Sequence, residues 1–159
     1  MRSGTLKWKF KTGEDPAIHN QVGIQSSAAV ADGIVYFGCR DSNLYALDVK
    51  RRKNGHSTTR DRGVISSPAV DKGRVYFSTS DTGLFYALDA KTGTVVFSVK
   101  FTWPLFSSRT IAGNTIYLGS NAGKFMAIDL AAQKQAWTYE TDASRQNGPA
   151  YTKADGTPD

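Results

Sequence analysis

Residues 66–99 read SSPAVDKGRVYFSTSDTGLFYALDAKTGTVVFSV, and this stretch determines the class of fold. It contains four short runs of apolar, β-branched and aromatic residues, at positions 68–70, 74–77, 85–88 and 95–99. Such runs are typical of β-strands, and the Gly-containing segments between them are typical of tight turns. The second and third runs are apolar on both sides of the pleat, which indicates a sheet covered on both faces. The stretch is therefore predicted to form a four-stranded antiparallel sheet.

The same pattern recurs on both sides of this stretch at a spacing of about forty residues. Gly33, Gly73 and Gly113, each just before a predicted strand, are 40 residues apart. Three further positions repeat with spacings of 40 or 41 residues, namely Tyr36, Tyr76 and Tyr117, then Ala46, Ala87 and Ala127, then Asp48, Asp89 and Asp129. Three copies in register indicate a repeat protein, and four strands in about forty residues are typical of one blade of a β-propeller.

A longer pattern, Ala-x-Asp-x-x-Thr-Gly-x-x-x-aromatic, spans the third predicted strand, the following turn and the fourth strand. It is complete in one unit, as Ala87, Asp89, Thr92, Gly93 and Phe97. The next unit retains Ala127, Asp129 and Trp137, with Gln133 in place of the glycine, and the first unit retains Ala46 and Asp48. Together with the flanking Ser-Ser-Pro-Ala-Val, this pattern resembles the tryptophan-docking repeat of the pyrroloquinoline-quinone (PQQ)-like β-propellers.

The resemblance implies a structural role for the residues of this motif, and the role has a physical basis. The small alanine leaves room for an aromatic ring against the sheet, and the aspartate carboxylate accepts backbone N–H groups of the turn that follows. Gly93 supplies a left-handed turn residue. We expect no catalytic, cofactor-binding or metal-binding residue, and nine structural docking residues: Ala46, Asp48, Ala87, Asp89, Gly93, Phe97, Ala127, Asp129 and Trp137.

The repeat predicts an all-β fold, a partial β-propeller of four-stranded antiparallel blades in a single domain over residues 1–159. We expect three blades, at residues 22–63, 64–101 and 102–141. Residues 1–11 would supply the last strand of a preceding blade, and residues 147–159 the start of the next one. Because propellers usually have about 4–8 blades, this arrangement predicts a fragment of a longer protein.

Residues 50–63 interrupt the repeat, and His56 stands where the fourth strand of the first blade should carry its aromatic side chain. The run contains six Lys or Arg residues and one Asp, which accounts for most of the formal net charge of +6. The sequence leaves three explanations for this run: a degenerate strand, a functional loop that binds a polyanion, or a sequence error. Nucleic-acid binding is not expected, because the positive charge is confined to one run without aromatic residues.

Motifs of catalysis and metal binding are missing from the sequence. Cys39 is the only cysteine, which excludes paired-cysteine motifs, and it aligns with Thr79 and Ser120 as a small, buried side chain. His19 and His56 lack the neighbouring Cys or paired carboxylates that a metal site requires. No stretch is apolar for long enough to span a membrane, and no signal peptide precedes the first predicted strand.

The resemblance implies two functions. One is a non-catalytic scaffold for protein–protein interaction or assembly, which binds a protein partner or the missing blades of its parent chain and needs no cofactor. The alternative is a fragment of a PQQ-dependent alcohol or sugar dehydrogenase, with PQQ, Ca²⁺ and the active-site residues outside this chain. Those enzymes carry an adjacent cysteine pair, which this chain lacks, so we favour the scaffold. The family implies a periplasmic or secreted parent protein.

A partial propeller is expected to expose the faces of its two terminal sheets. The predicted exposed residues are Leu44, Tyr45 and Leu47 at one end and Phe125, Met126 and Ile128 at the other. Terminal repeats normally need a polar cap, and large exposed apolar patches lead to association. We therefore expect the isolated chain to self-associate.

Overall fold

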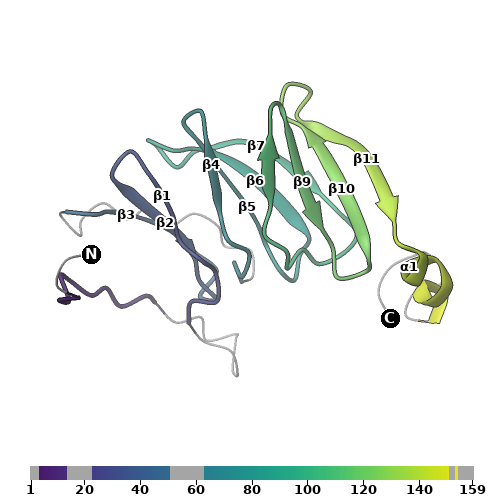
Figure 1. Cartoon of the computed structure of the whole chain (residues 1–159), viewed down its shortest axis with the longest axis horizontal. Helices are drawn as coiled ribbons and strands as arrows, with labels where there is room; N and C mark the ends of the chain where they lie inside the picture. Colours follow the sequence, from purple (N-terminus) through teal and green to yellow (C-terminus); the bar gives the residue numbers. More distant parts are fainter. Residues whose placement is uncertain (1–3, 14–22, 51–62, 151–152, 154–159) are drawn as a thin grey trace.

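The structure, a computed structural model, describes residues 4–13, 23–50, 63–150 and 153 of the 159-residue chain. Strands within these residues form three antiparallel sheets, which lie face to face in chain order (Figure 1). We call the sheets blades 1, 2 and 3. The predicted all-β fold and partial β-propeller are confirmed.

The strands of each blade follow one another in chain order across the sheet. Blade 1 contains β1 (Ala29–Ala31), β2 (Ile34–Gly38) and β3 (Leu44–Asp48). Blade 2 contains β4 (Ala69–Asp71), β5 (Arg74–Ser78), β6 (Leu84–Asp89) and β7 (Val95–Lys100). Blade 3 contains β8 (Thr110–Ala112), β9 (Thr115–Gly119), β10 (Lys124–Asp129) and β11 (Lys134–Glu140). The fourth strand expected for blade 1 lies outside the described residues, as do residues 51–62 of the basic run.

The first hairpin of each blade is closed by a two-residue turn. In blades 1 and 2, Asp32-Gly33 and Lys72-Gly73 have positive φ at both positions, which is the conformation of a type I′ turn. In blade 3 the turn begins with Gly113 at φ 60°. Since these turns match the natural twist of a hairpin, they fix the register of the first two strands in every blade.

In each blade, the hydroxyl of a serine that precedes the first strand is hydrogen-bonded to the backbone at the end of the second strand. Ser66 Oγ donates to Ser78 O at 2.9 Å and accepts from Ser78 N at 3.2 Å. Ser26 makes the same pair of bonds with Gly38, and Ser107 makes it with Gly119. Among the first strands of the blades, β1 contacts β4 and β4 contacts β8, as expected for inner strands that converge on a common axis.

The described residues cover the predicted partial blades at the two ends of the chain only in part. Residues 4–11, expected to supply the last strand of a preceding blade, form no strand. Of residues 147–159, expected to begin the next blade, residues 147–150 lie in α1 (Asp142–Asn147) and the 3₁₀ turn η1 (Gly148–Ala150), and all later ones except residue 153 lie outside the described residues. The helix starts because Thr141 caps it, accepting from Ser144 N at 3.2 Å.

Candidate functional site: the open face of blade 3

Each blade has two unlike faces. The forward face points toward the next blade along the chain and carries an aromatic or leucine side chain beside a small alanine. Its members are Tyr36, Leu44 and Ala46 in blade 1, Tyr76, Phe85, Ala87 and Phe97 in blade 2, and Tyr117, Phe125, Ala127 and Trp137 in blade 3. The rear face points toward the preceding blade. Its members are Val35, Phe37, Tyr45 and Leu47 in blade 1, Val75, Phe77, Tyr86 and Leu88 in blade 2, and Ile116, Leu118, Met126 and Ile128 in blade 3.

Forward faces are buried wherever a next blade is present. The Tyr76, Phe85 and Phe97 side chains of blade 2 pack against the rear face of blade 3 and are almost fully buried. In the same way, the forward face of blade 1 packs against the rear face of blade 2. These two interfaces are the two larger hydrophobic clusters among the described residues.

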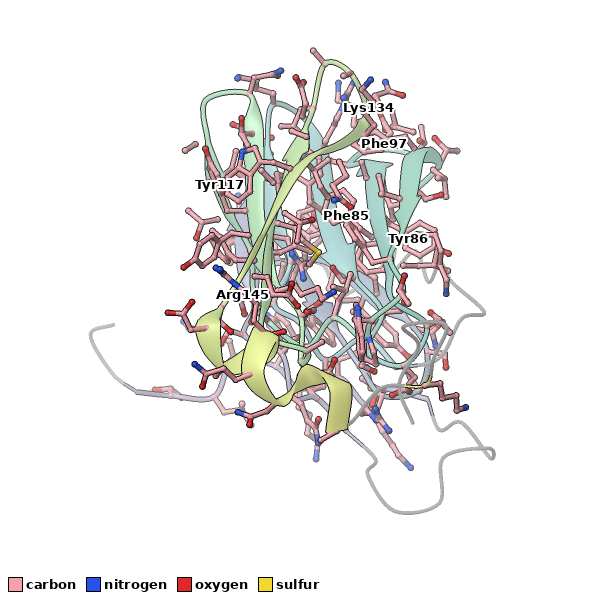
Figure 2. All side chains as sticks on the ribbon, turned by 90° about the vertical axis from the view of Figure 1, so that its right-hand side faces the viewer. Phe85, Tyr86, Phe97, Tyr117, Lys134 and Arg145 are labelled. Atoms are coloured by element: carbon pink, nitrogen blue, oxygen red, sulfur yellow. The ribbon has the colours of Figure 1, made fainter. Side chains whose placement is uncertain are left out.

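The forward face of blade 3 is open. Its three rings lie in mutual contact, with centroid separations of 6.2 Å for Tyr117–Phe125, 5.9 Å for Tyr117–Trp137 and 6.1 Å for Phe125–Trp137. Phe125 and Trp137 are each 44% exposed, and Tyr139 beside them is 53% exposed. Figure 2 looks onto this end of the molecule, with Tyr117 in the outermost sheet and Arg145 on the helix beneath it.

One charged side chain borders the open face, since the Arg145 guanidinium lies 5.8 Å from the ring of Tyr139. Lys124 and Glu140, whose Nζ and Oε1 atoms are 3.7 Å apart, alternate with Phe125 and Tyr139 along β10 and β11 and therefore lie on the other side of the sheet. Interfaces between proteins are enriched in aromatic residues at their centre. The open face therefore has the aromatic composition of a docking surface.

The opposite end of the molecule is covered, contrary to expectation. Residues 4–13 lie against the rear face of blade 1, on the side away from blade 2 (Figure 1). The Trp8 indole donates to Val49 O at 3.0 Å, the Phe10 and Tyr45 rings meet edge to face at 5.5 Å, and Gly13 N donates to the Tyr45 hydroxyl at 3.0 Å.

The predicted set of exposed terminal residues needs correction for this reason. Leu44 is buried against blade 2, and Tyr45 and Leu47 are buried beneath the segment with Trp8. At the other end Phe125 is exposed as predicted, whereas Met126 and Ile128 are buried because their side chains lie on the rear face. The sequence interpretation did not separate the two faces of each strand, although the alternation of residues along β10 carries that information.

The alanines of the docking motif lie opposite its aromatic residues. Ala87 pairs with Phe97 across β6 and β7, and Ala127 pairs with Trp137 across β10 and β11. In both blades the register shifts immediately after the alanine, which marks a β-bulge at the same place. Ala46 of blade 1 is buried, but its expected fourth-strand partner lies outside the described residues.

The aspartates of the motif organise the turn after the third strand. Asp89 Oδ1 accepts from Lys91 N at 2.9 Å, Thr92 N at 2.8 Å and Thr92 Oγ1 at 3.0 Å. These bonds, with the backbone N–H of Thr92 foremost, lower the pKa of the Asp89 carboxyl. Asp129 Oδ1 accepts from Ala131 N and Ala132 N, and Asp48 Oδ1 accepts from Lys50 N. Gly93 follows with φ 72°, in the left-handed region.

The buried side chains of Arg109 and Cys39 lie in different parts of the fold, Arg109 between blades 2 and 3 and Cys39 at the rear face of blade 1. Arg109, from the segment before β8, donates to Tyr76 O at 3.0 Å and Ser107 O at 3.3 Å, and burial lowers the pKa of its guanidinium to about 9. Cys39 is fully buried, as predicted, and its thiol lies 3.4 Å from Gly23 O. Burial raises the pKa of this thiol, so the reactive thiolate is disfavoured. Neither group is placed for chemistry on a substrate.

A shallow cleft of about 320 Å³ lies between the turns of blades 2 and 3. Its lining is Asp71, Lys72, Arg74, Tyr76, Asn114, Leu130 and Ala131. The charges of Lys72 and Asp71 partly cancel, since Nζ and Oδ2 are 3.7 Å apart. The cleft thus has mixed polarity and no grouped acid, base and nucleophile.

Within residues 4–13, 23–50, 63–150 and 153, no three His, Cys, Asp or Glu side chains are grouped so as to hold a metal ion. The single cysteine of the chain cannot form an adjacent cysteine pair. In the same part of the chain, no helix has the length and apolar character needed to cross a membrane.

The family model described as outer membrane protein assembly factor BamB matches residues 1–158. This chain belongs to the PQQ-like β-propeller repeat family. The resemblance inferred from the docking motif is therefore confirmed. No curated protein sequence matches the chain significantly.

Solved structures of the same fold include BamB and two alcohol-oxidising dehydrogenases. BamB from Moraxella catarrhalis has a TM-score of 0.63 and 18% identity over 74% of this chain and 37% of BamB. The quinohemoprotein alcohol dehydrogenase ADHIIG from Pseudomonas putida HK5 has a TM-score of 0.65 and 24% identity, over 78% and 21% of the two chains. A europium-containing methanol dehydrogenase has a TM-score of 0.60 and 15% identity, over 86% and 29%. At these identities the likeness shows the fold alone, and this chain spans well under half of each protein.

Proposed function

We propose that this chain is a non-catalytic β-propeller scaffold that binds a protein through the open forward face of blade 3. The observation that carries the proposal is the contrast between equivalent faces. Phe85 in blade 2 is 0% exposed beneath the next blade, whereas Phe125 at the same position in blade 3 is 44% exposed. A surface built like an internal interface, but left open, is suited to bind another β-sheet.

Two further observations support a scaffold. The buried Ser66 hydroxyl and Arg109 guanidinium donate to backbone carbonyls of the blades, which is a structural role, whereas Nε of Arg109 has no hydrogen-bond partner among the described residues. The matched family is described as an outer membrane protein assembly factor, which suggests assembly work at the cell envelope and a periplasmic parent protein. The protein partner, or the missing blades of the parent chain, would then complete the open interface.

The alternative is that the chain is a fragment of a PQQ-dependent dehydrogenase. The structural likeness to the alcohol dehydrogenase is the reason to test this alternative. Under that alternative the residues that hold PQQ and Ca²⁺ lie outside this chain. The purified chain would be supplied with PQQ and Ca²⁺ and assayed for dye-linked alcohol oxidation. We expect no turnover above the background of the cofactor alone. Because the alternative also places the active site outside this chain, only turnover is decisive in this assay, and it would overturn the scaffold.

A positive test of docking uses a photo-crosslinking phenylalanine analogue in place of Phe125. The matched control places the same analogue at Val95, which is 53% exposed on the outer strand β7 and lies outside the open face. In native periplasm we expect a discrete protein adduct from position 125 that position 95 does not give. Equal adducts from both positions, or none from position 125, would count against the proposed face.

A further inference from the structure

The chain carries both halves of a blade-to-blade interface. Blade 3 presents an open forward face, and blade 1 has a rear face whose four positions match the rear faces of blades 2 and 3. Those four positions carry aliphatic, aromatic or methionine side chains in every blade. In the two interfaces within the chain, a forward face always meets a rear face of this kind. The two unpaired halves are therefore complementary to each other.

Residues 4–13 bury the rear face of blade 1, where Phe37 is 8% and Leu47 is 1% exposed, but they bury less of their own apolar surface than a blade would. Leu6 of this segment is 74% exposed and Phe10 is 41% exposed, although both are large apolar side chains. The segment forms no strand and adds no strand-to-strand pairing to blade 1. By contrast, Phe77 and Phe85 in the interfaces between blades are fully buried. A cover with such incomplete burial is weaker than a full sheet.

From these observations we propose that the open face of blade 3 binds the rear face of blade 1 in a second copy of the chain, displacing residues 4–13. The segment acts as an intramolecular competitor that keeps the rear face of blade 1 covered until a forward face replaces it. This proposal rests on the proposed docking role of the open face and specifies one occupant for it.

The pairing is head to tail, because a forward face and a rear face are different surfaces. A contact of this kind either closes into a ring or continues as an open filament. Each copy contributes the three described sheets, and two copies would supply six, within the range of about 4–8 blades of closed propellers. A closed pair is thus compatible with the size of known rings, and closure would leave no forward face exposed.

The first experiment measures self-association by sedimentation velocity across the micromolar range. The variants are Trp8→Ala/Phe10→Ala, which weakens the cover, the same pair with Trp137→Ser, which also alters the open face, and Val95→Ser as a control for loss of an exposed apolar side chain. We expect the cover variant to associate at concentrations at least about tenfold lower than the unmodified chain. Adding Trp137→Ser should abolish that gain, and Val95→Ser should leave association unchanged.

A second experiment keeps the proposal testable if the cover variant does not fold. A synthetic peptide of residues 4–13 is added in excess to the unmodified chain. We expect it to lower self-association, since it competes for the rear face of blade 1, while a scrambled peptide should not. Absence of this effect would overturn the proposal, as would association in the cover variant that persists after Trp137→Ser.

The two proposals fail in distinguishable ways. If the crosslink from position 125 to another protein is present but self-association is insensitive to Trp137→Ser and to the peptide, the second copy is the wrong occupant and the docking face stands. If position 125 gives no specific adduct and self-association is equally insensitive, both proposals fall.

Discussion

Phe97 and Trp137 occupy the same place in successive blades, ten residues after the start of the docking motif, yet Phe97 is 8% exposed and Trp137 is 44% exposed. Each lies opposite the alanine of its motif, on the forward face of its blade. The sheet around them has the same register and the same bulge. The difference in exposure therefore comes from the presence of blade 3 against Phe97 and the lack of such a cover over Trp137.

The first prediction follows from this difference. Phe97→Ala should lower the free energy of unfolding by about 3–5 kcal/mol, because it opens a cavity in a packed interface. Trp137→Ala removes a larger side chain from a half-open surface and should cost distinctly less, about 1 kcal/mol. Equilibrium urea unfolding of both variants checks this order. Equal costs would mean that the forward face of blade 3 is covered in solution.

The repeat made most of the blade framework predictable from the sequence. The hairpin glycines, the strands at 74–77, 85–88 and 95–99 and the pairing of alanine with an aromatic residue follow from short-range rules of turn geometry and strand propensity. The role of the serine that precedes the first strand of each blade was harder to predict, although Ser26 and Ser66 repeat in register. Its role depends on a backbone contact twelve residues away, which strand propensity does not report.

The predicted strands were wrong where the structure of a segment depends on the part of the molecule against which it packs. The residues from Leu6 to Lys11 have strand-like alternation, but a strand exists only with a partner to pair with, and the segment instead lies against blade 1 through Trp8 and Phe10. At the other end, the forty-residue spacing suggested a new blade near Pro149. Thr141 instead caps a helix over the preceding residues, a local signal that competed with the repeat.

The second prediction concerns the buried serine of blade 2. Ser66→Ala should lower the free energy of unfolding by about 1–3 kcal/mol, because Ser78 N and Ser78 O lose their partner in a buried position. Ser98→Ala, on the exposed side of β7, is the matched control and should change stability by less than about 0.5 kcal/mol. Thermal or urea unfolding distinguishes them. A Ser66 variant as stable as the Ser98 variant would show that the serine bonds contribute nothing to the blade.

The third prediction compares two glycines at the same place in the repeat. A Cβ atom on Gly38 would lie 2.4 Å from Val64 Cγ1 and 2.5 Å from Val64 O, where blade 1 meets the lead-in to blade 2. On Gly119 the nearest atom would be Ser107 Oγ at 3.6 Å, an ordinary contact. Gly38→Ala should therefore destabilise the fold by about 1–3 kcal/mol through overpacking.

Gly119→Ala serves as the control for the loss of glycine itself, and it should be tolerated or slightly stabilising. Urea unfolding midpoints of the two variants, measured side by side, provide the comparison. If Gly119→Ala proves as costly as Gly38→Ala, contact with Val64 is not the cause.

The last prediction uses the pH dependence of the turn after β6. The Thr92 and Lys91 hydrogen bonds favour the carboxylate of Asp89, so its pKa in the folded state is below the value of about 3.9 in an unfolded chain. A depressed carboxyl pKa stabilises the fold above the unfolded pKa, and this stabilisation is lost as the pH falls through the folded pKa.

Asp89→Asn keeps the shape and one acceptor oxygen but removes the charge, so it should melt at a lower temperature than the unmodified chain at about pH 7. As the pH is lowered toward about 3, protonation makes the unmodified chain resemble the variant, and the difference in melting temperature should shrink. Asp89→Ala, which also removes the acceptor, should remain the less stable of the two variants throughout. A difference between the unmodified chain and Asp89→Asn that stays constant over this range would show that the charge of Asp89 does not hold the turn.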